Sequence, residues 1–298
     1  MATMRNFPEL LLEETRRPAP AAVHALVDAL RSKFDETLVA VLFYGSCRRD
    51  ADPYEGLIDL YVIVDKLRPH CSALSATLGW LLPPNVRYLE VPSEGRTARC
   101  KYALVSLDRF RHGIEQRFHP YFWARFAQPT SIVWCRDDSA HEALVESLLA
   151  APARLMQELP TVSTESEDPL ARWRDAFRRT YRAELRVESG DRGDRLVDSH
   201  RDYYLFLNSE LDGAATSGRR PWLLRTLRWD LRIVQGKAIS VLRLFKGFYT
   251  FEGGFDYLIW KLERHTGQHV EVPQRVRRWP LIFAWPMLWR LYREGVLR

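Results

Sequence analysis

Apolar residues in the first 136 positions follow the spacing of short strands separated by helices. Residues 38–44 (LVAVLFY) and 57–64 (LIDLYVIV) are β-rich runs, and the first of them stops at a glycine. Further strands are predicted at 86–91, 98–107 and 131–135, and helices at 20–35, 70–82, 107–118 and 120–128. This part of the chain is therefore predicted to form a mixed sheet with flanking helices.

From residue 138 onward the apolar spacing is helical. Helices are predicted near 139–158, 169–187, 193–212, 221–246, 253–265 and 279–293. The segment ELPTVSTESEDP (158–169), acidic and hydroxyl-rich with proline near both ends, is a plausible linker. The predicted fold is thus an α/β domain followed by an all-helical domain. We expect the units to be 1–137, 138–270 and a C-terminal segment, 271–298.

Composition narrows the range of partners. The chain of 298 residues has a net charge of +6, which suits an anionic partner without choosing among nucleotide, nucleic acid and lipid surface. Its arginines form no concentrated tract with a recognisable nucleic-acid-binding motif, so no nucleic acid is expected. No apolar run approaches the length of about 18 residues that a membrane span needs. The four cysteines form no C-x-x-C pair and are interpreted as free thiols in a reducing compartment.

The first candidate phosphate-binding residues are Gly45 and Ser46, where the first strand ends. Glycine lets the backbone approach a phosphate, and serine offers a hydroxyl. Asp59 on the next strand could hold a Mg²⁺ ion that bridges phosphates, and burying it would be costly unless it were paired or coordinated. Asp65 lies roughly 20 Å further along the strand, too far to share that ion. The alternative is an edge strand whose Asp59 faces solvent.

A second carboxylate would be expected for two-metal phosphoryl chemistry. The positions two residues before and after Asp59 hold Leu57 and Tyr61 instead. Glu55 and Glu90 are plausible further donors, although no spacing singles out either of them.

Four stretches in this order resemble a known family. They are YGS (44–46), LIDLYVIVD (57–65), CKYALVSLDRF (100–110) and PYFWARFAQP (120–129). Together they resemble the mitochondrial-type phosphatidate cytidylyltransferases, the family of the mitochondrial translocator assembly and maintenance protein. Residues 182–211 and 240–262 are similar to its helical half. The chain departs from the family's pattern at Cys47 and Ala103, where glycine is usual.

The resemblance implies a nucleotidyltransferase-like domain followed by a helical domain. It also implies Mg²⁺-dependent transfer of CMP from CTP to phosphatidic acid or a related lipid phosphate, forming CDP-diacylglycerol and pyrophosphate. Asp59 would ligate Mg²⁺ and Lys101 would pair with a phosphate, both acting in catalysis. The implied substrate-binding residues are Tyr44, Gly45, Ser46, Tyr121, Arg125, Arg186 and Lys246.

Two of these residues have structural alternatives. Lys101 could instead be a lysine at a sheet edge whose ammonium extends to solvent. Tyr121 and Arg125 lie four residues apart on one helical face and could meet one ligand, but aromatic core packing with a surface salt bridge is the alternative for that pair.

The C-terminal residues 275–298 mix arginines with three tryptophans. Basic residues beside Trp-rich apolar segments suit an anionic membrane surface, and packing on the protein's own core is the alternative. The family resemblance implies a cytoplasmic protein associated peripherally with the inner membrane.

Two other functions stay open. One is nucleotidyl transfer to a soluble hydroxyl compound, for which the sequence offers no convincing general base. The other is an inactive, membrane-associated nucleotide-binding protein.

Overall fold

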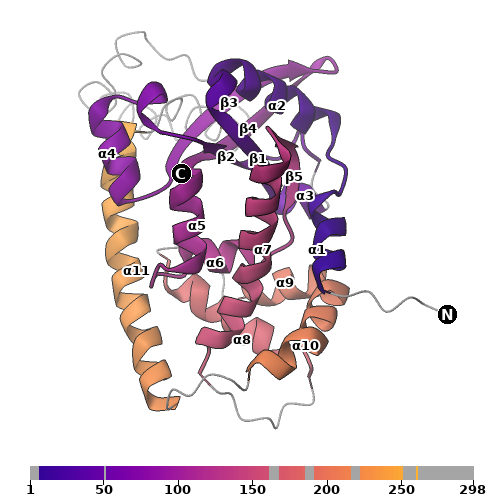
Figure 1. Ribbon diagram of the computed structural model, residues 1–298, viewed down its shortest axis with the longest axis vertical. Helices are drawn as coiled ribbons and strands as arrows, with labels where there is room; N and C mark the ends of the chain where they lie inside the picture. The colour runs from indigo at the N-terminus through magenta and orange to yellow at the C-terminus, as the bar shows by residue number, and fades with distance from the viewer. Residues whose placement is uncertain are drawn as a thin grey trace, which may run out of the picture.

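Five strands form one mixed sheet in the computed structural model, which describes residues 7–49, 52–160, 168–184, 191–215, 222–250 and 260 (Figure 1). The order across the sheet is β3-β4-β2-β1-β5. The strands are β1 (Leu38–Tyr44), β2 (Ile58–Val64), β3 (Asn85–Ser93), β4 (Arg96–Ser106) and β5 (Ser131–Cys135). All five were predicted from the sequence, with boundaries that differ by at most a few residues.

The strand β2 lies in the middle of the sheet. It pairs antiparallel with β1 and parallel with β4, which places Asp59 beside Tyr44 on one side and beside Lys101 on the other. An edge strand is therefore excluded for Asp59. The strand β4 likewise has β3 as its second neighbour, so Lys101 is not at a sheet edge either.

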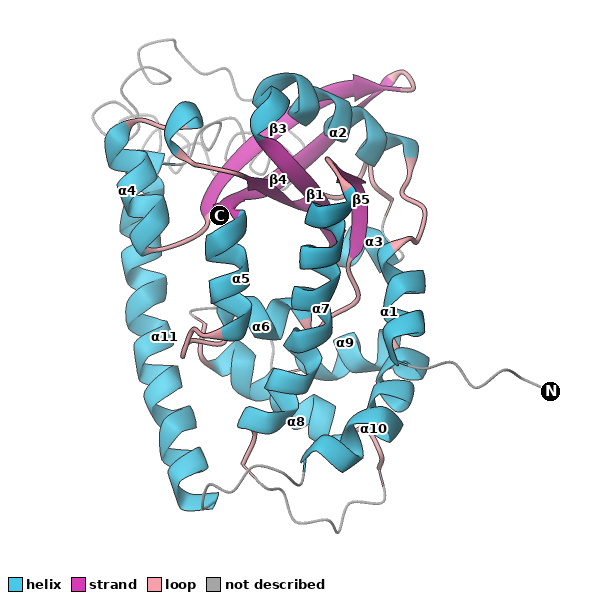
Figure 2. Cartoon of the chain, in the orientation of Figure 1, coloured by secondary structure: helices cyan, strands magenta, loops and turns pink. Residues whose placement is uncertain are grey.

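The two faces of the sheet pack against different helices (Figure 2). Side chains of β2 alternate between the faces: Leu60 and Val62 pack towards α2, whereas Tyr61 and Ile63 pack towards α5, α6 and α7. The helices of the first part of the chain are α1 (Phe7–Thr15), α2 (Ala21–Phe34), α3 (Ser46–Arg49), α4 (Ala73–Leu81), α5 (Leu107–Glu115) and α6 (Tyr121–Phe126). By alternation, Asp59 belongs to the face covered by α5–α7.

Only helices and connecting segments follow β5 in the described part of the chain. They are α7 (Asp138–Glu158), α8 (Ala171–Arg182), α9 (Arg192–Ser199), α10 (Arg201–Ala215) and α11 (Trp222–Thr250). Their apolar side chains join the same buried cluster as that face of the sheet. The predicted class, a mixed α/β sheet with flanking helices followed by helices, is confirmed.

The helices differ from the sequence prediction in two places. The single helix expected at 193–212 is divided at His200, whose backbone leaves the helical region after α9. The helix α1 was not predicted, because its short apolar run is weak evidence on its own. The fold secures α1 by burying Leu11 and by bonding Arg48 to the carbonyl of Glu14. The helix predicted at 279–293 lies outside the described residues, and so does the one predicted at 253–265 except for residue 260.

The long helix α11 is fastened to the end of α7 by buried polar groups. Arg232 is fully buried, donates to Glu158 Oε2 at 2.6 Å and to the carbonyl of Phe118 at 2.9 Å, and has its guanidinium over aromatic rings. The Trp229 indole donates to the carbonyl of Glu158, and Arg225 donates to that of Leu159. Trp229 and Arg225 thereby satisfy carbonyls at the C-terminal end of α7, where cations such as Arg225 are favoured. None of the described helices is long and apolar enough to cross a membrane.

We predict that Arg232→Met lowers the free energy of unfolding by about 3 kcal/mol, because it leaves a largely buried Glu158 carboxylate without its closest cation. Urea unfolding measures the change. Arg111→Met is the control, since Arg111 pairs with the exposed Glu146 and should cost less than about 1 kcal/mol. Equal losses in the two variants would show that the Arg232 pair does not fasten α11.

Candidate functional site

A cavity of about 450 Å³ lies where the end of the sheet meets the helices α6, α8 and α9. Residues from both halves of the chain line it. The lining comprises Tyr44, Gly45, Ser46, Arg49, Asp59, Lys101, Pro120, Tyr121, Ala124, Arg125, Gln128, Thr180, Tyr181, Glu184, Arg192, Arg195 and Leu196. The structure thus brings together most of the residues that the sequence motifs singled out, although they are spread over some eighty positions.

Gly45 is required by the geometry at the end of β1. Its backbone φ angle is +90°, which residues that carry a side chain rarely adopt. The chain turns at this glycine into the short helix α3. A Cβ atom at this position would lie 2.8 Å from Oδ2 of Asp59. Glycine therefore lets the backbone turn and also leaves room for the Asp59 carboxylate against the turn.

Asp59 and Lys101 form an ion pair inside the cavity. The Lys101 ammonium lies 3.4 Å from Oδ1 of Asp59, and both side chains stay partly exposed, by 38% and 25% respectively. The pair explains how a carboxylate is accommodated in an otherwise apolar strand. Because both groups face the cavity, each is also accessible to a ligand.

Arg125 lies at the centre of an aromatic and acidic cluster. Its guanidinium lies over the ring of Tyr121 at 4.8 Å, donates to the Tyr44 hydroxyl at 3.3 Å, and is 3.9 Å from the Glu184 carboxylate. Burial raises the pKa of Tyr44, and the nearby Arg125 only partly opposes that effect. Burial would also raise the pKa of Tyr121, but Arg125 and Arg243 outweigh it and lower that pKa. Tyr121 and Arg125 do share one face of α6, as their spacing predicted.

The cavity includes residues that the sequence motifs did not single out. Arg49 follows the Gly-Ser turn, whereas Glu184, Arg192 and Arg195 come from the stretch around α8 and α9. Glu184, Arg192 and Arg195 lie within residues 182–211, which resembled the cytidylyltransferase family. A signal for the region was therefore present, but nothing in it distinguished these side chains from the chain's many other charged residues.

Two predicted substrate-binding residues are not brought to the cavity by the described structure. Lys246 on α11 is buried elsewhere and donates to the carbonyls of Leu82 and Pro84, both at 2.6 Å. Burial and the neighbouring Arg243 lower its pKa to about 7. We therefore correct the expectation for Lys246, because its ammonium is used to hold α11 to the segment after α4. Arg186 lies outside the described residues.

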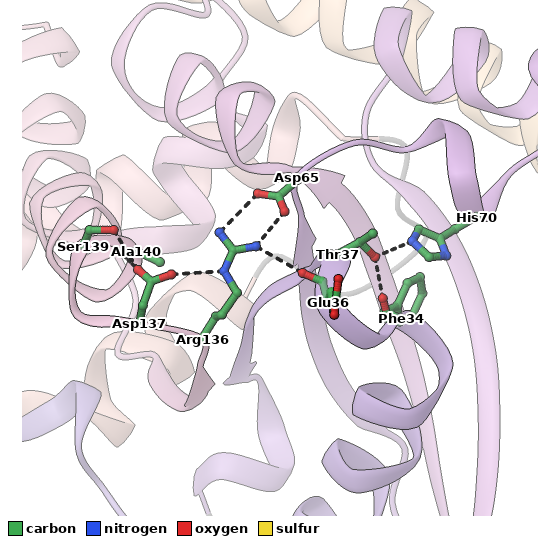
Figure 3. A network of polar contacts seen from close by, with 9 residues as sticks. All are labelled: Phe34, Glu36, Thr37, Asp65, His70, Arg136, Asp137, Ser139 and Ala140. Atoms are coloured by element: carbon green, nitrogen blue, oxygen red, sulfur yellow. Dashed lines mark hydrogen bonds and ion pairs between the residues drawn. The ribbon is translucent and has the colours of Figure 1, made fainter.

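The other carboxylates considered in the sequence analysis do not line the cavity. Glu90 pairs with Arg99 at 3.4 Å, and Glu55 does not line the cavity. Asp65 accepts two hydrogen bonds from Arg136, the shorter at 2.6 Å, and Arg136 also binds Asp137 (Figure 3). This network is structural: Asp137 caps α7, and hydrogen bonds from Ser139, the Ala140 amide and Arg136 lower its pKa to about 2.

Few side chains of the cavity could hold a Mg²⁺ ion. The described residues contain no group of three or more His, Cys, Asp or Glu side chains placed to hold a metal. Asp59 and Glu184 are the carboxylates among the cavity's lining residues. Magnesium is commonly held by one or two carboxylates together with substrate phosphates and water. The described residues of the cavity fit that kind of site, in which Asp59 would be the protein ligand, and do not fit a metal cage built by the protein alone.

Comparison with the solved structures finds 14 similar chains. The chain is similar to the crystal structure of a nucleotidyltransferase-like protein from Exiguobacterium sibiricum, with 12% identity over 93% of this chain and 92% of that chain and a TM-score of 0.26. No protein-family model matches the chain, and no curated protein matches it.

We predict that Gly45→Ala lowers the free energy of unfolding more than Gly95→Ala does. Both glycines have positive φ, so each substitution should cost about 1–2 kcal/mol from backbone strain. Only at Gly45 does the added methyl group meet another side chain, that of Asp59, whereas nothing lies within 4 Å at Gly95. Urea unfolding of the two variants measures the difference, and equal losses would mean that Asp59 does not press against the turn.

Proposed function

We propose that the protein is a Mg²⁺-dependent nucleotidyltransferase that transfers CMP from CTP to phosphatidic acid or a related lipid phosphate, forming CDP-diacylglycerol and pyrophosphate. The observation that supports this most is that Gly45, Ser46, Asp59, Lys101 and Arg125 line one and the same cavity. These residues belong to the four stretches whose order resembles the mitochondrial-type phosphatidate cytidylyltransferases.

The charge of the cavity suits a nucleoside triphosphate. Its cationic side chains are Lys101, Arg49, Arg125, Arg192 and Arg195, and its carboxylates are Asp59 and Glu184. Guanidinium and ammonium groups are the usual partners of phosphate oxygens in proteins. The volume of about 450 Å³ is within the range typical of small-molecule sites, roughly 300–1,000 Å³.

The chemistry requires little proton transfer by the protein. A phosphate oxygen of the acceptor attacks the α-phosphorus of CTP, and the bond from that phosphorus to the oxygen bridging to the β-phosphate breaks, releasing pyrophosphate. A phosphate monoester is already ionised near pH 7, so no strong general base is needed. Lys101 and the cavity arginines would neutralise phosphate oxygens as charge develops on the leaving group. A Mg²⁺ ion held by Asp59 would supply further neutralisation and orient the triphosphate.

A lipid acceptor would require access to a membrane surface. We propose that the protein is cytoplasmic and associates peripherally with the anionic inner membrane. The C-terminal segment expected to make that contact, 275–298, lies outside the described residues.

Glu184 supports a second candidate function, nucleotidyl transfer to a soluble hydroxyl compound. Such an acceptor benefits from a general base near the reacting oxygen. Glu184 lines the cavity and is 3.9 Å from Arg125, so a carboxylate is available where sequence reasoning found none.

We expect purified protein to form CDP-lipid from labelled CTP, Mg²⁺ and phosphatidic-acid micelles. Asp59→Ala should lower turnover by at least about 100-fold, because it removes the carboxylate proposed to hold the metal. Asp65→Ala is the matched control: it removes another carboxylate just beyond the same strand, one that Arg136 holds, and should leave turnover close to that of the wild type. CTP binding without turnover on any lipid phosphate, or full activity of Asp59→Ala, would contradict the proposal.

Glu184→Gln separates the two candidate acceptors. Transfer to a lipid phosphate should change by less than about threefold, because an ionised phosphate needs no base. Transfer to a hydroxyl acceptor should fall by about 100-fold or more if Glu184 is its base. Product analysis by thin-layer chromatography with each acceptor class measures both rates, and a large loss of lipid-phosphate transfer would contradict the first candidate.

A further inference from the structure

The helix α11 buries its charged face and exposes its apolar face. On the inner side, Arg225, Trp229, Arg232 and Lys246 are buried, and each donates a hydrogen bond to α7, to the residue after it, or to the segments before α6 and after α4. Arg243, also on this side, lies 3.8 Å from the ring of Tyr121 in the cavity. A surface helix normally has the opposite arrangement, with its apolar stripe on the core.

The outer side of α11 carries a regular line of exposed apolar residues. Its members are spaced alternately three and four residues apart over three heptads: Leu224, Leu227, Leu231, Val234, Ala238, Val241 and Phe245. The larger members are well exposed, for example Val234 by 67% and Phe245 by 62%. This line, called the α11 seam below, runs along the outside of the molecule, where α11 stands at one edge (Figure 1).

The spacing of the seam is that of a coiled coil. A repeat of 3.5 residues keeps a narrow stripe facing one partner helix, with the seam residues in the a and d positions. A helix that lies in a membrane interface instead has a broad apolar face along its length, and its polar side is rich in Lys and Arg. In α11 the exposed Leu223, Leu242 and Leu244 widen the apolar face near the two ends of the seam, whereas polar residues border its middle. The polar residues beside the seam on its g side are one acid and one base, Asp230 and Lys237, both exposed.

These two charges make the seam complementary to itself when two copies run antiparallel. If Leu231 faces Val234 of the partner subunit, Asp230 comes beside Lys237 of the partner subunit, and the twofold axis repeats the pair. Sliding one helix by a heptad would instead bring Lys237 beside Lys237 of the partner subunit. A parallel pair would place Asp230 near Gln235 of the partner subunit and form no pair of opposite charges.

We propose that the protein forms a symmetric dimer in which α11 of one copy packs antiparallel on α11 of the other along the α11 seam. The contact is isologous, because the same surface of each copy meets itself about a twofold axis. Burial of the seam supplies the association energy, and the two Asp230–Lys237 pairs select the orientation and register. The proposal does not depend on which reaction the cavity catalyses.

The test is a charge exchange between two single variants of the full chain, followed by sedimentation equilibrium. Lys237→Asp puts acid opposite acid and Asp230→Lys puts base opposite base, so each variant alone should have its dimer dissociation constant raised by at least about tenfold. An equimolar mixture places acid opposite base at both pairs and should restore association close to that of the wild type. Leu231→Glu should abolish the dimer. At a protein concentration low enough for the wild type to be monomeric as well, the two chains should have the same thermal melting curve.

Three results would overturn the proposal. One is a wild-type chain that stays monomeric, and another is a mixture that associates no better than the single variants. The third is a Leu231→Glu chain that melts at a lower temperature than the wild type when both are monomeric, which would show that the chain's own residues cover the seam. Flotation with anionic vesicles serves as a further arm: a monomeric wild type whose vesicle binding is lost in Leu231→Glu would assign the seam to a lipid surface instead.

Discussion

The position of β2 between two strands is the constraint on which the candidate site depends. Because β2 pairs with β1 on one side and β4 on the other, Tyr44, Asp59 and Lys101 lie in one row across the sheet. The row lies at the level where β1 ends at Gly45, and the absence of a side chain there leaves space for the Asp59 carboxylate. A slip of one residue in either register would turn Asp59 towards the opposite apolar face, where its charge would have no partner.

The helices after β5 supply part of the cavity wall. They share the apolar cluster on the site's face of the sheet, and α8, α9 and the residue Glu184 close the cavity over the row of strand residues. Arg125 connects the two parts, because it contacts Tyr44 at the sheet and Glu184 near the end of α8. The arrangement, with one carboxylate at the sheet end and cations around it, would suit the polyanionic substrate that we propose.

Arginine has two different uses in this chain, and composition does not separate them. Arg48, Arg225 and Arg232 are buried and bonded to backbone carbonyls or carboxylates, whereas Arg49, Arg192 and Arg195 line the cavity. Burying such groups on the inner face of α11 leaves its apolar residues outside. That inversion underlies the proposed dimer, and through Arg243 it also joins α11 to the cavity.

The sequence by itself determined the strands, most helices and the grouping of the first site residues. Residues 38–44 and 131–135 are β-rich runs bounded by turns, and their local pattern is sufficient to define them. Only the tertiary structure decided that Lys101 faces Asp59, that Glu184 and Arg195 reach the cavity, and that Lys246 does not. Those outcomes depend on strand order and helix packing between residues far apart in the chain. Local periodicity carries no information about such pairings, because it records which face a residue occupies and not which partner lies opposite.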